Sequence, residues 1–328
     1  MKIAHIFAND SLESRGIKFV NASHKNGIDT CEYLRGKNQS YLNFLFKTIK
    51  SALKDNIKVI HAHRISGYLP SIFIKILRPK TRIIYDKHDI HKYDFVFDRL
   101  MFFSDWALTA SEMHLEHVKK FKKNSEVIPN YADFKPVSEK IKQRVRKEAG
   151  LKKEEVLLLF QGSIVKDYGL DLLLDALPMI DKKVKLVIIG WLKEPDYWES
   201  IKKNLTERVV YLGTKKYSEM NDYVGAADIG VVLFKKSKLT LFGNPAKLFE
   251  FINCKVPVVV TDIECVSKYI RKYRNGIIVD DKKELAEAIN KLADKKTREK
   301  YSKKSPTLRF EEEFKKKYIP ILKSLQND

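Results

Sequence analysis

The chain has 328 residues, enough for two domains of ordinary size, and 44% of them are hydrophobic, so both domains can have a core. No apolar run reaches the roughly 18 to 20 residues that a membrane-spanning helix needs, and the apolar stretch at residues 3–8 is too short for a secretory signal. The three cysteines, Cys31, Cys254 and Cys265, are scattered without metal-ligand spacing. We therefore expect a cytoplasmic protein with reduced thiols and no bound metal.

The net charge of the chain excludes few classes of partner. Lysine and arginine total 63 against 42 acidic residues, a net charge of +21, which attracts nucleic acid, anionic lipid headgroups or phosphorylated substrates. Most lysines are spread along the chain, with one dense cluster at residues 119–123. Because the sequence lacks a basic stripe interleaved with aromatic residues and lacks a known nucleic-acid-binding motif, we expect no nucleic acid partner. A basic nucleic-acid-binding protein is the less favoured alternative.

The first half of the chain alternates short apolar runs with longer amphipathic ones. This rhythm predicts right-handed βαβ units and a parallel sheet covered by helices. The apolar helix at 68–77 would also suit membrane contact, but packing on the sheet explains it as well and is favoured. The expected strands are 2–8, 57–60, 82–85 and 106–109, and the expected helices are 41–53, 68–77, 95–103 and one capped by Ser111.

Polar residues follow two of these strands. His61, His63 and Arg64 come after the strand at 57–60, and His88 comes after the strand at 82–85. Parallel sheets bind ligands at the carboxyl ends of their strands, so these side chains are candidates for a site.

The second half repeats the pattern after a polar, basic junction at 133–153. We expect a second α/β sheet there and a lysine-rich helix at the end of the chain. The expected strands are 156–160, 184–189, 209–212, 229–234, 256–260 and 277–279, and the expected helices are 170–177, 217–227, 283–292 and 310–325.

The residues that lead into the strand at 256–260 are the most informative. Asn244 is a good helix N-cap and Pro245 suits the first helical position. The start of such a helix has free N–H groups and a positive dipole end, which favour phosphate. Lys247 and Glu250 are three residues apart and share a face, so a cation would lie beside the phosphates and a carboxylate beside the ribose of a nucleotide sugar. A capped core helix with two solvated charges explains the same residues equally well.

Taken together, these segments resemble a known family, the GT-B fold glycosyltransferases, and among them the large retaining family 4. The resemblance covers nearly the whole chain and implies an α/β protein with two facing Rossmann-like domains that contain parallel sheets. The first domain, 1–135, would lie on the acceptor side, the second, 136–309, would bind the nucleotide sugar, and the helix at 310–328 would pack back on the first. The segments that carry the resemblance, in the family's order, are 127–133, 160–163, 168–176, 186–190, 211–213, 226–228 and 245–251.

The resemblance also implies roles for individual residues. Glu250 matches the glutamate that holds the donor ribose, and His88 matches the histidine that faces the reacting sugar, although a core histidine is the alternative. His63 and Arg64 would face the acceptor side. Gly16 would lie in the loop after the strand at 2–8, near the phosphates, although an ordinary turn glycine is an equal alternative. The implied donor-binding residues are Gly16, Gly162, Ser163, Gly190, Gly213, Thr214, Tyr217, Gly243, Asn244, Pro245, Ala246 and Lys247.

Three positions depart from the family's pattern. The first of its two acidic residues is Phe242, the usual arginine of the phosphate loop is Ser163, and the usual lysine before the next glycine is Tyr168. We therefore expect Lys166 and Lys247 to meet the diphosphate charge, with a solvated Lys166 as the alternative.

The expected function is transfer of a sugar from a nucleotide-diphosphate sugar to a glycan or lipid-linked acceptor, in surface polysaccharide or glycolipid assembly. Retention of configuration is implied by the family. Fixed lysines and a helix N-terminus would stabilise the leaving diphosphate without a metal or other cofactor. The basic first domain would bind the anionic inner face of the membrane as a peripheral protein. A sugar-nucleotide epimerase of the same fold and a non-catalytic relative are the alternatives, the latter because of Phe242 and Ser163.

Overall fold

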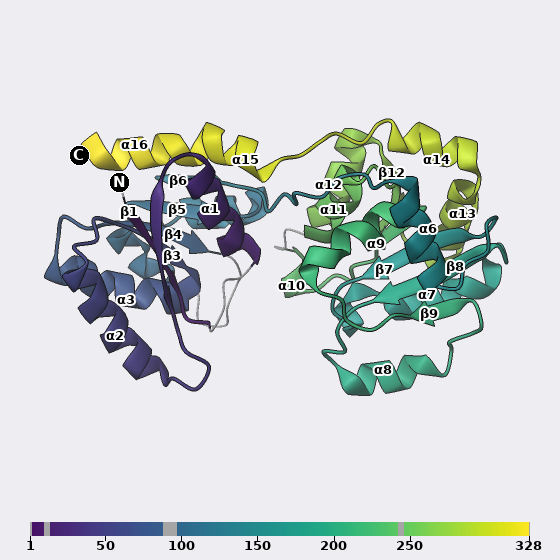
Figure 1. Ribbon diagram of the computed structural model, residues 1–328, viewed down its shortest axis with the longest axis horizontal. Helices are drawn as coiled ribbons and strands as arrows, with labels where there is room; N and C mark the ends of the chain where they lie inside the picture. The colour runs from purple at the N-terminus through teal and green to yellow at the C-terminus, as the bar shows by residue number, and fades with distance from the viewer. Residues whose placement is uncertain (1, 10–13, 88–96, 242–245, 328) are drawn as a thin grey trace. The chain divides into compact units, whose positions relative to one another are not determined.

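The computed structural model describes residues 2–9, 14–87, 97–241 and 246–327, and the chain divides into two compact units (Figure 1). The first unit contains residues 1–130 and 310–328, and the second contains residues 131–309. The boundary lies after Asn130, five residues before the predicted one. Each unit contains a six-stranded parallel sheet with flanking helices, which confirms the predicted α/β class.

The sheet of the first unit has the strand order β2-β1-β3-β4-β5-β6. Every pair of neighbouring strands is parallel, so all six carboxyl ends lie at one edge. Its strands are β1 (Lys2–Phe7), β2 (Asp29–Leu34), β3 (Val59–His63), β4 (Arg82–Lys87), β5 (Trp106–Thr109) and β6 (Ser125–Val127).

Helices cover both faces of this sheet. On one face, Phe44, Tyr68, Met101 and Val118 pack with alternate strand residues into an apolar core. On the other face, Phe19 packs edge to face on Phe310, with ring centres 5.0 Å apart, so the end of the chain completes this side of the unit. The helices of the first face are α2 (Tyr41–Lys54), α3 (Arg64–Leu77), the 3-10 helix η1 (Arg99–Phe103) and α5 (Glu112–Lys119); those of the second are α1 (Ser14–Lys25), α15 (Phe310–Glu313), the π-helical turn η5 (Phe314–Tyr318) and α16 (Ile319–Asn327).

The predicted elements of this unit omit two strands, β2 and the three-residue β6, and end a third strand too early. The strand β2 was not expected, because it lies at the edge of the sheet and its residues alternate between exposed and half-buried, without an apolar run. The third strand runs further than expected and includes His61 and His63, which do not follow it as predicted. All five residues of β3 are buried, so the polar imidazoles belong to the interior of the unit.

The sheet of the second unit has the order β12-β11-β10-β7-β8-β9, again with parallel neighbours throughout. All six residues of β7 are buried, as expected for a central strand covered on both sides. Its strands are β7 (Val156–Gln161), β8 (Val184–Ile189), β9 (Val209–Tyr211), β10 (Ile229–Val232), β11 (Val258–Thr261) and β12 (Gly276–Val279).

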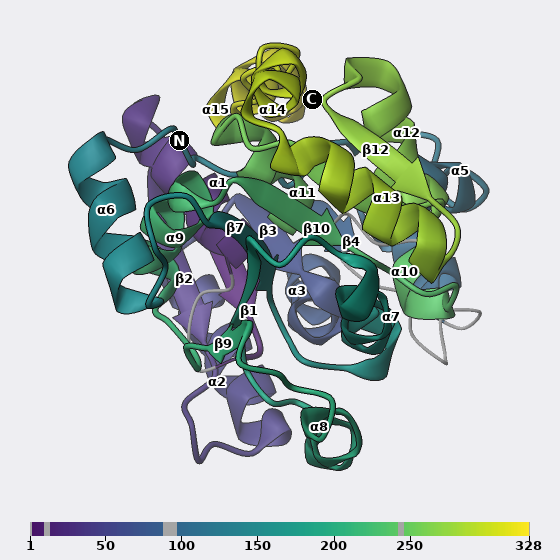
Figure 2. The same ribbon diagram turned by 90° about the vertical axis from the view of Figure 1, so that its right-hand side faces the viewer.

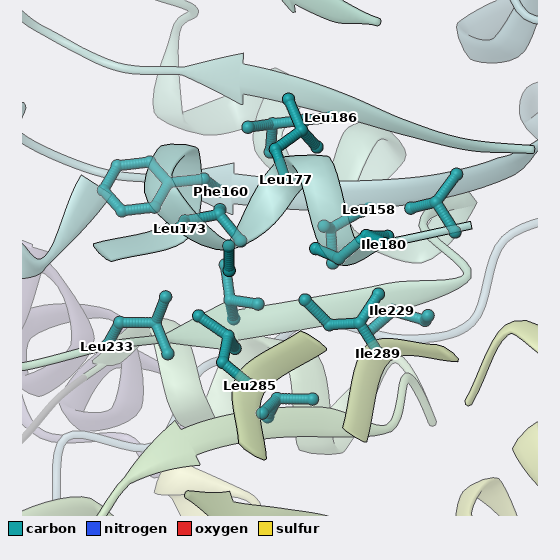
Figure 3. Close-up of a cluster of buried hydrophobic side chains, with 14 of the residues drawn as sticks. Leu158, Phe160, Leu173, Leu177, Ile180, Leu186, Ile229, Leu233, Leu285 and Ile289 are labelled. Carbon is teal, nitrogen blue, oxygen red and sulfur yellow. The ribbon is translucent and has the colours of Figure 1, made fainter. Parts of the chain in front are cut away.

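Alternate residues of the central strand β7 enter two separate cores. Leu158 and Phe160 pack against Leu173 and Leu285 on one side (Figure 3). Leu157 and Leu159 pack on the opposite side, where α6, α9, α11 and α12 lie (Figure 2). The helices are α6 (Glu139–Glu148), α7 (Leu170–Ala176), α8 (Pro195–Lys202), α9 (Met220–Ala226), α10 (Lys238–Leu241), α11 (Ala246–Asn253), α12 (Glu264–Tyr273), α13 (Lys282–Ala293) and α14 (Lys295–Ser302), with 3-10 turns η2 (Lys166–Tyr168), η3 (Leu177–Met179) and η4 (Tyr217–Glu219).

Helices α8, α12 and α14 were not among the predicted elements. Helices α8 and α14 are rich in charged residues and bury one residue and none, so the apolar periodicity that marks a packed helix is weak there. Helix α12 does carry that signal, because Val266 and Ile270 are buried one turn apart, and the sequence interpretation missed it. Among the described residues, no helix is both long and apolar enough to cross a bilayer.

Candidate functional site

Three glycines join the loops at the carboxyl ends of β7, β8 and β9. The Gly162 amide donates a hydrogen bond to the Ile189 carbonyl (3.0 Å), and the Gly190 amide donates one to the Gly213 carbonyl (3.0 Å). A methyl group added to Gly190 would lie 1.9 Å from the Gly162 carbonyl oxygen, so only glycine allows this approach. The predicted donor-binding residues Gly162, Gly190 and Gly213 therefore form one continuous junction.

Lys247 reaches this junction from the first turn of α11. A methyl group added to Gly162, whose φ is +112°, would lie 2.9 Å from the Lys247 ammonium nitrogen. The same nitrogen lies 3.8 Å from the centre of the Tyr168 ring and 5.1 Å from that of Phe234. Aromatic faces attract a cation, but burial opposes its charge and lowers the pKa of Lys247 to about 7, with Glu250 acting in the opposite direction. A cation thus lies beside the Gly162 backbone.

Glu250 lies one turn further along α11 and is 5% exposed. Its carboxylate accepts a hydrogen bond of 2.9 Å from the side-chain amide of Gln161, the last residue of β7. Burial together with the Glu250 and Asp133 carboxylates raises the pKa of Tyr217. The structure therefore brings Glu250, Tyr217 and Gln161 together. The sequence interpretation missed Gln161, although its place before Gly162 at a strand end was a usable signal.

The remaining predicted donor-side residues of this unit lie around the junction. The Thr214 hydroxyl donates to the Gly190 carbonyl (3.2 Å). Ser163 is half-buried in the loop after β7, and Ala246 is the first residue of α11. The Lys166 side chain is exposed at the start of η2, where its backbone amide donates to Glu194. Contact of Lys166 with a diphosphate stays a prediction.

Some predicted residues lie outside the described ranges. These are His88, which was expected to face the reacting sugar, and three residues before α11: Gly243, Asn244 and Pro245.

In the first unit, Gly16 does not lie in the loop after β1, as predicted, but in the first turn of α1. A methyl group added there would lie 2.3 Å from the Phe7 ring, so this glycine allows close packing of α1 on the sheet. Arg64 follows β3 with a φ of +58°, a left-handed conformation that costs a non-glycine residue about 1 kcal/mol. Such strain is often found at functional sites, but contact of Arg64 or the buried His63 with an acceptor stays a prediction.

Sequence reasoning missed a buried polar cluster in this unit. The Asp86 carboxylate pairs with the Arg15 guanidinium (2.9 Å), and the imidazoles of His61 and His63 lie 3.5 and 3.6 Å from the same oxygen. His5 Nδ1 is 3.1 Å from His63 Nε2. Burial and His61 lower the pKa of His5 well below its usual value, so this imidazole is neutral at pH 7.

Three close histidines have the residue types of a metal site. Candidate ligand atoms of His5, His61 and His63 lie within 4.8 Å of one another. However, the rings of His61 and His63 stack with an interplanar angle of 16°, so their in-plane lone pairs lie in two nearly parallel planes and do not meet at one point. We interpret the cluster as a buried electrostatic network, in which Arg15 hydrogen-bonds to Asp86 and the two imidazoles lie beside that carboxylate at 3.5 and 3.6 Å, longer than a hydrogen bond of normal length.

Two units with parallel sheets, and a polar site at the carboxyl ends of the second sheet, define the GT-B glycosyltransferase fold. The family model described as glycosyl transferases group 1 matches residues 141–307. The chain belongs to this family.

Similar proteins were found by sequence and by structure. TuaC of Bacillus subtilis, named as a teichuronic acid biosynthesis glycosyltransferase, is 29% identical over 156 residues; the match covers 47% of this chain and 37% of TuaC, less than two thirds of its length. The structure of Anabaena Alr3699/HepE in complex with UDP and glucose aligns with a TM-score of 0.78 and 14% identity, over 98% of this chain and 100% of that one. A Listeria monocytogenes structure named as a UDP-N-acetylglucosamine 2-epimerase aligns with a TM-score of 0.68 and 10% identity, over 100% and 97% of the two chains.

Proposed function

We propose that the protein transfers a sugar from a nucleoside-diphosphate sugar to a glycan or lipid-linked acceptor, in surface polysaccharide or glycolipid assembly. One observation carries this proposal. Lys247 and Glu250, three residues apart on α11, meet Gly162 and Gln161 at the carboxyl end of β7. Glycine backbone, a cation and a carboxylate are the groups that a diphosphate and a ribose require. Alr3699/HepE, a protein of similar fold, was solved with UDP and glucose.

The chemistry to be explained is departure of the diphosphate. When the bond from the anomeric carbon to the diphosphate breaks, negative charge grows on the phosphate oxygens, and a fixed cation stabilises it without reorganisation. Lys247 would supply this charge, assisted by the start of α11 and by Lys166. Glu250, held by Gln161, would accept hydrogen bonds from the ribose hydroxyls. The acceptor hydroxyl would attack on the face that the diphosphate leaves, which retains the anomeric configuration without a metal ion.

The acceptor would be reached at a membrane. The net charge of +21 favours an anionic surface, with each nearby cation contributing about 1 kcal/mol. A lipid-linked acceptor would be held at such a surface, so we propose a cytoplasmic protein that binds the inner face of the membrane.

A thermal-shift titration with nucleoside diphosphates and their sugars tests the donor site, because a ligand bound only by the folded form raises the melting temperature. Lys247→Ala and Glu250→Gln should each abolish the shift at a donor concentration that is near saturating for the unmodified protein. The matched controls are the exposed Lys296→Ala and Glu287→Gln, which should keep it. The donor assignment fails if no nucleotide raises the melting temperature, or if the two site variants respond like their controls.

A second candidate is a relative that binds the nucleotide sugar without transferring it. Ser163 and Tyr168 stand where the family has cations, and Phe242 stands where it has an acid. The similarity to a structure named as an epimerase also means that the fold by itself does not establish transfer. Product analysis with and without a lipid-linked acceptor separates the two: transfer gives a glycosylated acceptor, whereas epimerisation gives an altered nucleotide sugar without one.

A further inference from the structure

The outer surfaces of α2 and α3 are apolar. On α2, Leu42 and Phe46 lie one turn apart and are 66% and 67% exposed. On α3, Phe73, Ile76 and Leu77 share one face and are 47%, 56% and 61% exposed. We call these five side chains the α2–α3 face. The two helices pack side by side over the sheet of the first unit (Figure 1), so their exposed residues belong to one layer.

This surface continues along the same side of the sheet. The Tyr68 hydroxyl donates a hydrogen bond to the Leu100 carbonyl (2.8 Å), which ties α3 to η1, where Phe102 is 67% exposed. Lys122 donates to the Ser104 carbonyl, which brings the turn at 119–123 beside the end of η1. The lysine cluster noted in the sequence thus lies next to exposed aromatic residues.

Within the two helices the charged side chains have one sign, and the acidic Asp55 follows α2 as its C-cap. The segments 41–54 and 64–77 contain five lysine or arginine residues and no acidic residue. Lys47, Lys50 and Lys54 are exposed on α2, and none of them forms an ion pair with the residues that the structure describes. By contrast, Lys75 points away from the face and pairs with Asp105 at 2.6 Å. The free cations are therefore those beside the apolar side chains.

We propose that the α2–α3 face docks on a bilayer rich in anionic lipid, with its apolar side chains in the headgroup layer and its lysines on the lipid phosphates. An exposed apolar stripe flanked by lysines is typical of helices that lie in the plane of a membrane interface. Single-stranded nucleic acid would use the lysines and stack on the phenylalanines, but it would leave the aliphatic Leu42, Ile76 and Leu77 unburied. A protein partner would use the apolar residues, but the three lysines on α2, unpaired among the described residues, favour an anionic surface. This inference identifies the surface that would bind the membrane, and it rests on the membrane binding in the proposed function.

Vesicle flotation tests the inference with the full chain and without donor or acceptor. The protein should float with phosphatidylcholine vesicles that contain phosphatidylglycerol and not with phosphatidylcholine alone. Phe46→Ser/Phe73→Ser should weaken binding at least about tenfold. Lys47→Gln/Lys50→Gln/Lys54→Gln should weaken it by up to about fivefold per lysine.

The second unit provides matched controls. Met179→Ser replaces an exposed apolar residue there, and Lys291→Gln/Lys296→Gln/Lys300→Gln removes three exposed charges. Both controls should bind vesicles within about twofold of the unmodified protein if the α2–α3 face itself makes the contact. The charge control tests whether the total charge of the protein alone explains the binding. The nucleotide-induced shift of melting temperature, measured on every variant, separates loss of docking from loss of the fold or donor site.

A tryptophan probe locates the contact. Phe46→Trp should show a blue-shifted emission on vesicle addition and quenching by lipid brominated on its acyl chains, whereas Met179→Trp should show neither. The proposal is overturned if neither vesicle binds the protein, if the phenylalanine variant binds like the unmodified one, or if the probe at position 46 stays unquenched. It is also overturned if the lipid-free protein is a dimer that Phe46→Ser/Phe73→Ser dissociates, since the face would then serve self-association.

Discussion

The ammonium nitrogen of Lys247 lies 3.8 Å from the centre of the Tyr168 ring, closer than to the rings of Phe234 at 5.1 Å and Phe160 at 5.8 Å. Tyr168 occupies a position where the resembled family has a lysine. The resemblance therefore implies that an aromatic ring stands in place of a second cation and attracts the remaining one. The exchange keeps the Lys247 ammonium beside Gly162, where it can meet a diphosphate.

Replacing the ring tests that relationship. Tyr168→Leu keeps apolar bulk but removes the π face, so we expect donor affinity to fall by about 2- to 30-fold, the equivalent of 0.5–2 kcal/mol. Tyr168→Phe keeps the ring and should bind within about twofold of the unmodified protein. Calorimetric titration with a nucleoside-diphosphate sugar provides the comparison. Equal affinities for the two variants would mean that the ring does not hold the lysine.

The pKa of Lys247 predicts a pH dependence of donor binding. With a pKa of about 7 in the free protein, the ammonium loses its charge as the pH rises, so affinity should fall by up to about tenfold per pH unit between pH 7 and 9. Lys247→Arg keeps its charge throughout and should flatten the profile. Calorimetry in buffers of different ionisation enthalpy should show proton uptake on binding at pH 8. Binding without proton uptake would contradict the prediction.

The same pKa has a consequence for the protein without ligand. The pKa of Lys247 in the folded state lies below its usual value of 10.5, so the unfolded chain binds more protons between pH 7 and 10.5. The contribution of Lys247 to the free energy of unfolding therefore rises with pH across that window. Donor binding and stability thus respond to pH in opposite directions at one residue.

Gln161 provides a test of the buried carboxylate. Gln161→Met removes the 2.9 Å hydrogen bond to Glu250 while keeping the side-chain length. Since hydrogen bonds to charged groups contribute about 1.5–3 kcal/mol, we expect a comparable loss of stability in the second unit and weaker donor binding. Gln143→Met, at an exposed position on α6, is the control and should change stability by less than about 0.5 kcal/mol. Denaturation, monitored by hydrogen exchange in β7, measures the stability of the two variants. A Gln161 variant as stable as the control would contradict the prediction.

Two glycines of the junction allow the cost of a steric clash to be compared with the cost of backbone strain. Gly190→Ala places a methyl group 1.9 Å from a backbone oxygen, so the loops after β7 and β8 must move, and we expect a loss of about 3 kcal/mol together with loss of donor binding. Gly213→Ala meets nothing within 4 Å but has a φ of +69°, so it should cost about 1 kcal/mol. Melting temperatures and nucleotide shifts of the two variants provide the test. The reverse order of stability would show that the junction is not tightly packed.

Acid should loosen the first unit before the second. The pKa of buried His5 lies below its usual value of 6.5. As the pH falls through 6.5, the unfolded chain therefore binds a proton that the folded unit does not bind. The stability of the first unit should therefore drop by up to about 2 kcal/mol between pH 7 and 5. Hydrogen exchange, corrected for intrinsic rates, should show lost protection in β1 and β3 at pH 5, with β7 and β8 as the internal reference. A His5→Phe variant should lose less.

The sequence predicted much of the fold because its buried strands are apolar and its helices have clear caps. Ser111, for example, caps α5 through a hydrogen bond from the His114 amide at 3.3 Å. The edge strand β2 escaped prediction because half-exposed residues leave no apolar run. His61 and His63 were placed outside β3 because imidazoles are polar; their burial depends on Asp86 and Arg15, which come from other elements.

The donor side shows the same limits. The spacing of Lys247 and Glu250 was visible in the sequence, and α11 supports their shared face. The rings around Lys247 were not predictable as a group, because Tyr168, Phe234 and Phe160 come from three separate segments that only the fold brings together. The contact of Gly16 with Phe7 likewise depends on how a helix crosses the sheet.

Tyr318 lies within hydrogen-bond distance of His61, at 2.7 Å, although 257 positions separate them in the chain. On a translating ribosome, the second unit emerges complete while the first still lacks the aromatic residues of its last helices. The first unit thus closes only after residues 310–318 have emerged, and until then its buried imidazoles stay open to water on that side.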